Sequence, residues 1–240
     1  MSTSTAAAAT AQDDTGKRTL LVGSVMLATL MQALDTTIAN VALPDMQGSL
    51  SATQDQVSWV LTSYIVAAAI LTPVTGWLAG RLGRRRLLII AVSGFTVASL
   101  LCGIAPSLEL LILFRVLQGA LAGPMIPLSQ SLLLQSYPPE KRAIAMALWT
   151  MTIIVAPIFG PILGGWLSDN WHWSWIFFIN VPVGVVAAWL SWRELRHRET
   201  AILQLPIDKV GLTLLVLGVG CLQMMLDRGK ELDWFHSTEI

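Results

Sequence analysis

Charge is scarce in this sequence, and neither sign is in excess. The 240 residues include 15 basic and 15 acidic side chains, so 12% of the chain is charged and the formal net charge is zero. A soluble domain has about 25% charged residues, and a disordered chain combines low hydrophobicity with high net charge. With 54% hydrophobic residues, the chain fits neither class, and nucleic acid is not expected as a partner.

Motifs for catalysis, metal binding and nucleotide hydrolysis are also missing. The two cysteines, Cys102 and Cys221, lie in different apolar segments and suggest neither a disulfide nor a metal site. No phosphate-binding G-x-x-x-x-G-K-[ST] motif occurs, so active transport would need an ion gradient or a separate subunit. No nucleophile, base and orienting group can be assembled from the remaining polar residues. We therefore expect neither an enzyme nor a bound cofactor.

Long apolar runs are abundant in this sequence. A membrane-spanning helix needs about 20 mostly apolar residues, and such windows recur along nearly the whole chain. We place seven spans, at residues 19–43, 57–80, 87–106, 109–135, 143–168, 173–192 and 209–226. The expected fold class is an all-α, multi-pass membrane protein. Residues 1–18 are small and polar and predict a disordered tail, whereas residues 193–208 form a polar linker.

Basic residues gather on one side of these spans. They precede the first span or follow the second, fourth and sixth, and they are Lys17, Arg18, Arg81, Arg84, Arg85, Arg86, Lys141, Arg142, Arg193, Arg196, Arg198 and Lys209. The opposite loops carry acidic residues, namely Asp45, Asp55, Glu109 and Asp169. Because Lys and Arg are retained in the cytoplasm, the N-terminus is predicted to be cytoplasmic and residues 227–240 periplasmic.

Two charged residues, Asp35 and Arg115, lie inside the apolar spans. A charge at the centre of a membrane helix costs roughly 2.5–3.5 kcal/mol and usually faces a protein interior or a wet cavity. Beside Asp35, polar residues recur every three or four positions along one helix face, at Thr29, Gln32, Thr36 and Asn40. This stripe predicts that the first span lines a cavity. Gln118 shares the face of Arg115, where small residues permit close helix approach, at Gly119, Ala122 and Gly123.

Asp35 and Arg115 are expected at similar depth. At about 1.5 Å per helical residue, both lie roughly 9–13 Å from the outer ends of their spans. We hypothesise that they are alternating partners, with the arginine favouring the ionised carboxylate until a proton or a cationic substrate disturbs the pair. Two alternatives stay open. In the first, Asp35 serves only helix packing; in the second, Arg115 holds a neighbouring carbonyl without touching substrate or proton.

The fifth span contains the sequence "APIFGPILGGW" at residues 156–166. Pro157 and Pro161 each remove a backbone donor, and Gly160 and Gly164 form a G-x-x-x-G pair, so we expect a kink with tight packing against a neighbour. An ordinary small-residue packing face is the alternative. The second and fifth spans end in related residues, "TGWLAG" at 75–80 and "GGWLSD" at 164–169, on opposite faces of the membrane. This relation is typical of inverted repeats in secondary transporters.

Together these segments resemble the major facilitator superfamily, and specifically its 14-helix drug:proton antiporter branch. The resemblance covers residues from about 19 to 240. "LDTTIANVALP" at 34–44 matches the first-helix motif of that branch, "LILFRVLQGALAGP" at 111–124 the fourth-helix motif of the superfamily, and "APIFGPILGG" at 156–165 the antiporter motif. It implies an N-terminal six-helix bundle over residues 19–192, built as a 3+3 inverted repeat, with residues 209–226 as one linking helix and the C-terminal half absent.

The resemblance also implies a function. It is proton-driven multidrug efflux of hydrophobic or cationic drugs across the inner membrane, with a periplasmic adaptor protein and an outer-membrane channel as partners. Arg115 would serve proton coupling, and the fifth-helix residues would serve export: Pro157, Gly160, Pro161, Gly164 and Gly165. Gly76, Gly83 and Arg84 correspond to the superfamily's loop motif, although Gly80 replaces its usual aspartate and Ala156 a frequent glycine. The alternatives are a uniporter or importer of a small metabolite, and a truncated assembly fragment that does not transport.

Overall fold

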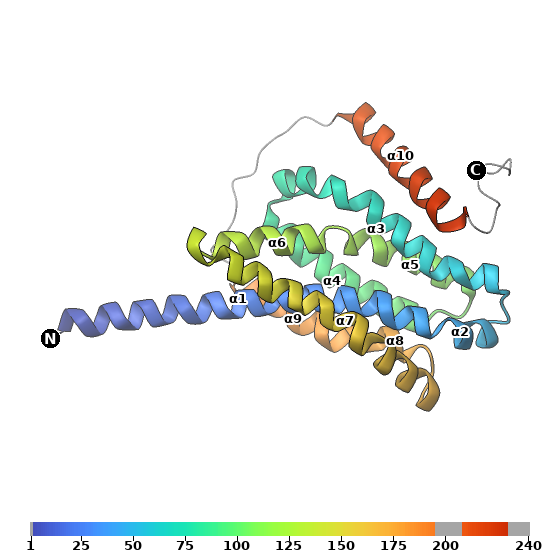
Figure 1. Ribbon diagram of the computed structural model, residues 1–240, viewed down its shortest axis with the longest axis horizontal. Helices are drawn as coiled ribbons and strands as arrows, with labels where there is room; N and C mark the ends of the chain where they lie inside the picture. Colours follow the sequence, from blue (N-terminus) through green and yellow to red (C-terminus); the bar gives the residue numbers. More distant parts are fainter. Residues whose placement is uncertain (1, 195–207, 230–240) are drawn as a thin grey trace.

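The computed structural model describes residues 2–194 and 208–229, and every regular element in these ranges is a helix. The elements are α1 (Ser2–Val41), α2 (Leu43–Ser49), α3 (Gln54–Leu82), α4 (Arg84–Gly103), α5 (Leu108–Ala122), α6 (Met125–Ser136), η1 (Pro139–Lys141), α7 (Arg142–Asn170), α8 (Trp175–Phe178), α9 (Asn180–Glu194) and α10 (Lys209–Arg228). The long helices run side by side as one bundle, and α1 extends past it toward the N-terminus (Figure 1).

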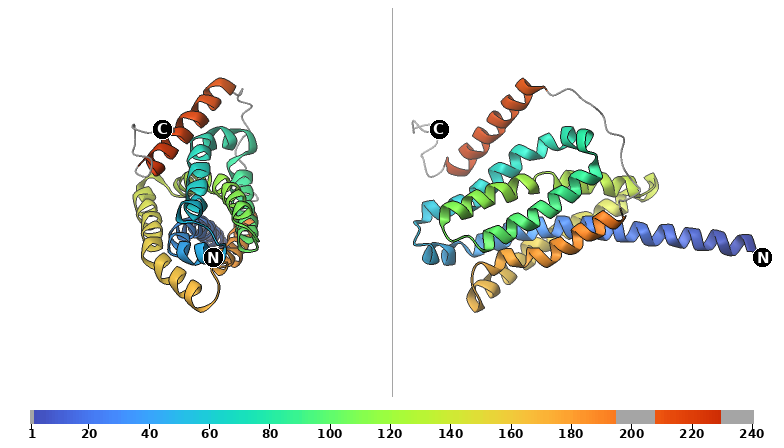
Figure 2. Two further views of the ribbon diagram at one scale, coloured as in Figure 1. Left: turned by 90° about the vertical axis from the view of Figure 1, so that its right-hand side faces the viewer. Right: turned by 180° about the vertical axis from the view of Figure 1, so that it is seen from behind.

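Six helical segments of the described chain are long and apolar enough to cross a membrane. They are Thr19–Val41, Gln54–Leu82, Arg84–Gly103, Leu108–Ser136, Pro139–Asn170 and Trp175–Arg193. These match the first six predicted spans within a few residues and confirm a multi-pass membrane protein. The seventh predicted span forms α10, whose described apolar part, Val210–Gln223, is shorter than the other six. It lies at the edge of the bundle against α3 (Figure 2).

Two of the spans consist of two helices each, which hydropathy does not predict. The fourth is interrupted at Gly123 and Pro124, where α6 begins immediately after the proline. Proline favours the first residues of a helix because it lacks an N–H that would be unpaired there. The sixth is interrupted at Ile179 between α8 and α9. Both interruptions fall near the residues that form the buried polar site described below.

Two expectations about the basic end differ from the structure. Residues 81–86 were expected as a loop, but α3 continues to Leu82 and α4 starts at Arg84, leaving only Gly83 between them. Arginine is a good helix former, and Gly83 makes the turn at a φ of 82°, which glycine adopts without strain. The tail at 1–18 was expected to be disordered, whereas α1 is helical from Ser2, in keeping with its alanine run. The expected linker and periplasmic end largely lie outside the described residues, which omit 195–207 and 230–240.

The packing of the helices has the symmetry of an inverted repeat. Let the first trio be α1, α3 and α4, and the second trio α5 with α6, α7, and α8 with α9. In the first trio, α1 packs against α7 and α9 of the second. Its counterpart α5 packs against α3 and α4, which are the counterparts of those two helices. Since α4 and α9 are counterparts of each other, the contact between them is its own equivalent under the repeat symmetry. These pairings give the 3+3 inverted repeat that the sequence predicts.

Candidate functional site

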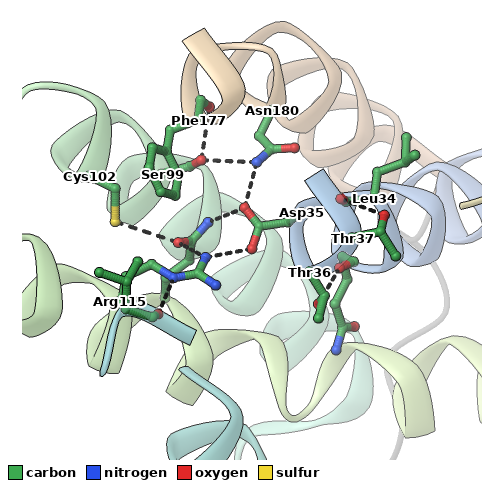
Figure 3. Close-up of polar contacts among 12 residues, drawn as sticks. Leu34, Asp35, Thr36, Thr37, Ser99, Cys102, Arg115, Phe177 and Asn180 are labelled. Carbon is green, nitrogen blue, oxygen red and sulfur yellow. Dashed lines mark hydrogen bonds and ion pairs between the residues drawn. The ribbon is translucent and has the colours of Figure 1, made fainter. Parts of the chain in front are cut away.

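The two charges predicted within the spans form an ion pair. Asp35 lies on α1 and Arg115 on α5, and Nη1 of the guanidinium donates to Oδ2 of the carboxylate over 2.6 Å (Figure 3). The arginine is 0% exposed and the aspartate 2% exposed. Removing one member of such a buried pair costs several kcal/mol, because the other charge is then left uncompensated. The pair also joins the corresponding helices of the two trios.

Two amides complete the shell around the carboxylate. Gln118 Nε2 and Asn180 Nδ2 donate to Asp35 Oδ1 over 2.9 and 2.8 Å. The same Asn180 nitrogen donates to the Ser99 hydroxyl, which donates in turn to the Phe177 carbonyl. The carboxylate therefore accepts hydrogen bonds from α1's neighbours α5 and α9. A carboxylate with three donors is well stabilised as an anion, even without water.

The guanidinium has acceptors of its own besides Asp35. Arg115 Nε donates to the Val60 carbonyl over 3.0 Å, and Nη1 also donates to Gln118 Oε1 over 2.8 Å. Its central carbon lies 4.1 Å from the ring centre of Tyr64 and 5.6 Å from that of Phe177. Aromatic faces attract a desolvated cation by as much as about 2 kcal/mol. The positive charge is thus held from several sides, and Gln118 touches both members of the pair.

Local sequence explains why these groups converge. Arg115 and Gln118 are three residues apart and so lie on one face of α5. At Gly119, a methyl group would overlap the Tyr64 carbonyl and lie 2.9 Å from its Cα, so only glycine permits this approach of α3 to α5. Gly123 meets the Ala68 carbonyl in the same way, at 2.7 Å from the position of a Cβ. The glycines bring α3, and with it Val60 and Tyr64, onto the arginine.

The polar stripe on α1 is placed less uniformly than the sequence predicts. Gln32 is buried, Thr36 is partly buried and Asn40 is exposed. Thr36 and Asn40 donate to carbonyls one turn earlier on their own helix, and among the described contacts neither reaches the Asp35 carboxylate. The Gln32 Oε1 atom is buried and has no hydrogen-bond partner among the described residues. Thr29 accepts a hydrogen bond from the Trp149 indole on α7.

The fifth-helix motif packs directly on α1. Gly160 and Gly164 face Thr37 and Ile38, and a Cβ at Gly164 would lie 3.1 Å from the Ile38 carbonyl. The Thr37 hydroxyl donates to the Ala156 carbonyl over 3.2 Å. Gly165 is looser, because its nearest neighbour would lie 3.9 Å from a Cβ.

The two prolines of that motif do not interrupt their helix. α7 runs as a single helix through Pro157 and Pro161, from Arg142 to Asn170. The predicted tight packing is present at Gly160 and Gly164. The helix continues through both prolines without a break, and the kink stays a prediction.

The loop motif stands apart from the ion pair. Gly76 has open space around its Cα, Gly83 makes the turn between α3 and α4, and Arg84 is the first residue of α4. None of the three shares a described hydrogen bond with the buried network. Gly83 and Arg84 lie at the turn that joins the second and third spans, whereas Gly76 lies within α3.

Several members of the network were not predicted. Asn180, Ser99 and Tyr64 are buried and contribute an amide, a hydroxyl and an aromatic face, and Cys102 lies 3.5 Å from Gln118 Oε1. Single polar residues in apolar runs are common, so their type alone does not distinguish them. Asn180 had the strongest signal, because an amide in the middle of "WIFFINVPVG" must find a partner in the membrane. Among the described residues, no group of three or more His, Cys, Asp or Glu could hold a metal ion.

Comparison with known proteins assigns the family. The model of the Major Facilitator Superfamily matches residues 25–223. The chain belongs to this superfamily. Its members are transporters and not enzymes, and the match confirms the resemblance stated from the sequence motifs.

Curated relatives narrow the similarity within the superfamily. Multidrug export protein EmrB of Haemophilus influenzae is 63% identical over 225 residues, which cover 94% of this chain and 44% of that protein. Fatty acid resistance protein FarB of Neisseria gonorrhoeae is 61% identical over 217 residues, covering 90% and 43%. EmrB of Escherichia coli K12 is 59% identical, covering 90% and 42%. The chain thus spans less than half the length of these relatives.

Solved structures support the fold alone. A peptide transporter, POT, superposes with a TM-score of 0.68 at 13% identity, covering 89% of this chain and 47% of that one. The xylose transporter XylE of E. coli gives a TM-score of 0.66 at 16% identity, covering 90% and 60%. Both are superfamily transporters, and the present chain matches about half of each.

Proposed function

We propose that this chain is the N-terminal half of a proton-driven multidrug exporter of the EmrB type. The observation that carries the proposal is the buried ion pair between Asp35 and Arg115, 2.6 Å apart and almost inaccessible to solvent. Charges inside a membrane protein usually mark a proton or substrate path. Two relatives named multidrug export protein EmrB, at 63% and 59% identity, support export of drug-like compounds.

The hydrogen bonds suggest how the site exists in two charge states. When Asp35 takes up a proton, its attraction for Arg115 is lost, but the guanidinium keeps the Val60 carbonyl, Gln118 Oε1 and the Tyr64 ring. When the proton leaves, the carboxylate accepts hydrogen bonds from Arg115, Gln118 and Asn180. Arg115 Nη2 and Gln32 Oε1, which have no described hydrogen-bond partner, retain capacity for water or substrate. Asp35 then exchanges a proton for a hydrophobic or cationic drug.

The remaining proposed roles follow from helix packing. Gly160 and Gly164 allow α7 to pack closely against α1 beside Asp35, so a movement of α7 would shift the position of the carboxylate. We place the protein in the inner membrane with the N-terminus cytoplasmic, because basic residues dominate the turn between α3 and α4 and the start of α7. A periplasmic adaptor protein and an outer-membrane channel would complete the export route.

Drug-induced proton movement tests the proposal. The full-length protein that contains this chain is assayed in everted vesicles, with Asp35→Asn as the variant and Asp55→Asn, an exposed carboxylate at the start of α3, as the control. We expect wild type and control to release protons when drug is added, and Asp35→Asn to release none. Normal coupling in Asp35→Asn would refute the role of Asp35. A wild type that moves drug without protons would indicate a uniporter instead.

A further inference from the structure

A basic and aromatic surface lies where α4 begins and α9 ends. We call it the α4/α9 patch, and it consists of Arg85, Arg86, Trp189, Trp192 and Arg193. Its two sides are joined by a hydrogen bond from Arg85 Nη2 to the Trp192 carbonyl, 3.4 Å long. Because α4 and α9 also pack along their length, arginines from two helices meet at one end of the bundle. The proposed transport chemistry does not use this surface.

The tryptophans of the patch face outward. Trp189 is 52% exposed and Trp192 is 53% exposed, although both are large apolar residues. They are three residues apart and so lie on one face of α9. Arg193 belongs to the same face, and its guanidinium lies 5.4 Å from the Trp189 ring centre. Indole rings of this kind sit at the level of lipid head groups.

Apolar side chains continue from the patch toward the membrane centre. On α4, Ile90 follows Arg86 by four residues and Val97 by eleven, so all three share a face, and the two apolar residues are 50% and 56% exposed. On α9, Val185 and Val186 precede Trp189 by one turn and are also exposed. Each helix thus presents cations at its end and hydrocarbon below them. This arrangement is complementary to a phospholipid, whose charged head group lies above its apolar acyl chains.

We propose that the α4/α9 patch binds the head group of an anionic phospholipid, with the acyl chains along the exposed faces of α4 and α9. Arginine pairs with phosphate through several N–H donors, and basic pockets between membrane helices are known to hold anionic head groups. Trp189 and Trp192 fix the depth of the lipid, and Arg86 and Arg193 supply charge. Bound lipid would tie the third span to the sixth at this end of the bundle.

Lipid binding by the purified 240-residue chain tests this proposal without any transport assay. Native mass spectrometry in detergent gives the Kd for phosphatidylglycerol and for zwitterionic phosphatidylcholine. We expect phosphatidylglycerol to bind at least tenfold more tightly. The variant Arg86→Gln with Arg193→Gln should lose about 25-fold in affinity for phosphatidylglycerol, since each basic residue near the surface contributes about fivefold. Both side chains are exposed, and neither makes the hydrogen bond that joins the helices.

The matched control is Lys141→Gln with Arg142→Gln. It removes the same charge from exposed residues at η1 and the start of α7, away from α4 and α9. We expect its affinity for phosphatidylglycerol to stay within about threefold of wild type. Equal losses in both double variants would overturn the proposal, because they would show attraction by net charge alone. Displacement of the lipid by millimolar glycerol 3-phosphate would also overturn it, in favour of a site for free phosphate.

Discussion

Removing one member of the Asp35–Arg115 pair should cost more stability than removing both charges. Arg115→Leu leaves the carboxylate with two neutral amide donors and no counter-charge, which predicts a loss of about 3–5 kcal/mol. Asp35→Asn leaves the guanidinium with two oxygen acceptors and the Tyr64 ring, so this variant should lose only about 3 kcal/mol of stability. In the double variant no charge remains uncompensated, and the loss should be smaller than that of Arg115→Leu.

The double-mutant cycle is measured on the purified chain in mixed micelles. Unfolding is followed through tryptophan fluorescence as the fraction of denaturing detergent rises, and the four free energies give the coupling directly. We expect a coupling of at least 2 kcal/mol. Single-variant losses that add within about 0.5 kcal/mol at neutral pH would refute the reasoning.

Two further variants probe the helix contacts around the pair. Gly119→Ala places a methyl group against the Tyr64 carbonyl and should lower stability by about 1–3 kcal/mol in the same micelle assay, whereas Gly76→Ala, with open space around it, should be neutral or slightly stabilising. Equal effects would contradict the close contact between α3 and α5. Trp149→Phe removes the indole donor to Thr29 and should cost about 1 kcal/mol, and a neutral result would show that this bond between α1 and α7 contributes nothing.

Hydropathy and charge were sufficient to predict most of the fold. Apolar windows located the six long spans of the described residues, since backbone groups in a membrane must form their hydrogen bonds within the protein. The meeting of Asp35 and Arg115 was also predictable, because the helical rise gives depth and a buried charge requires a partner. The interruptions at Gly123 and Ile179 were not predictable, because one continuous helix and two consecutive helices give the same hydropathy pattern.

The uncharged members of the site were harder to predict for a related reason. Ser99 donates to the Phe177 carbonyl, and Tyr64 offers a ring face to Arg115. A serine hydroxyl can also bond to a carbonyl of its own helix, and an aromatic ring packs without any polar partner, so neither residue type specifies its partner. Arg115 differs, because its charge restricts it to very few sites. The predictability of a contact therefore rose with the free-energy cost of leaving its side chain without a partner.

The repeat symmetry explains why the network has the form observed. Asp35 on α1 and Arg115 on α5 occupy corresponding helices of the two trios, and Ser99 on α4 and Asn180 on α9 occupy another corresponding pair. Each central helix also binds a carbonyl of the helix beside it. Arg115 donates to Val60 on α3, and Thr37, two residues beyond Asp35, donates to Ala156 on α7.

Those two outer helices, α3 and α7, also correspond. The bonds at Val60 and Ala156 thus join corresponding pairs of helices but differ in chemistry, since one donor carries a charge and the other does not. A proton on Asp35 would weaken the hold on Arg115 and leave the Thr37 bond unchanged. Protonation is therefore expected to weaken the hold of α1 on α5 more than its hold on α7, so the helices of the second trio would not respond equally.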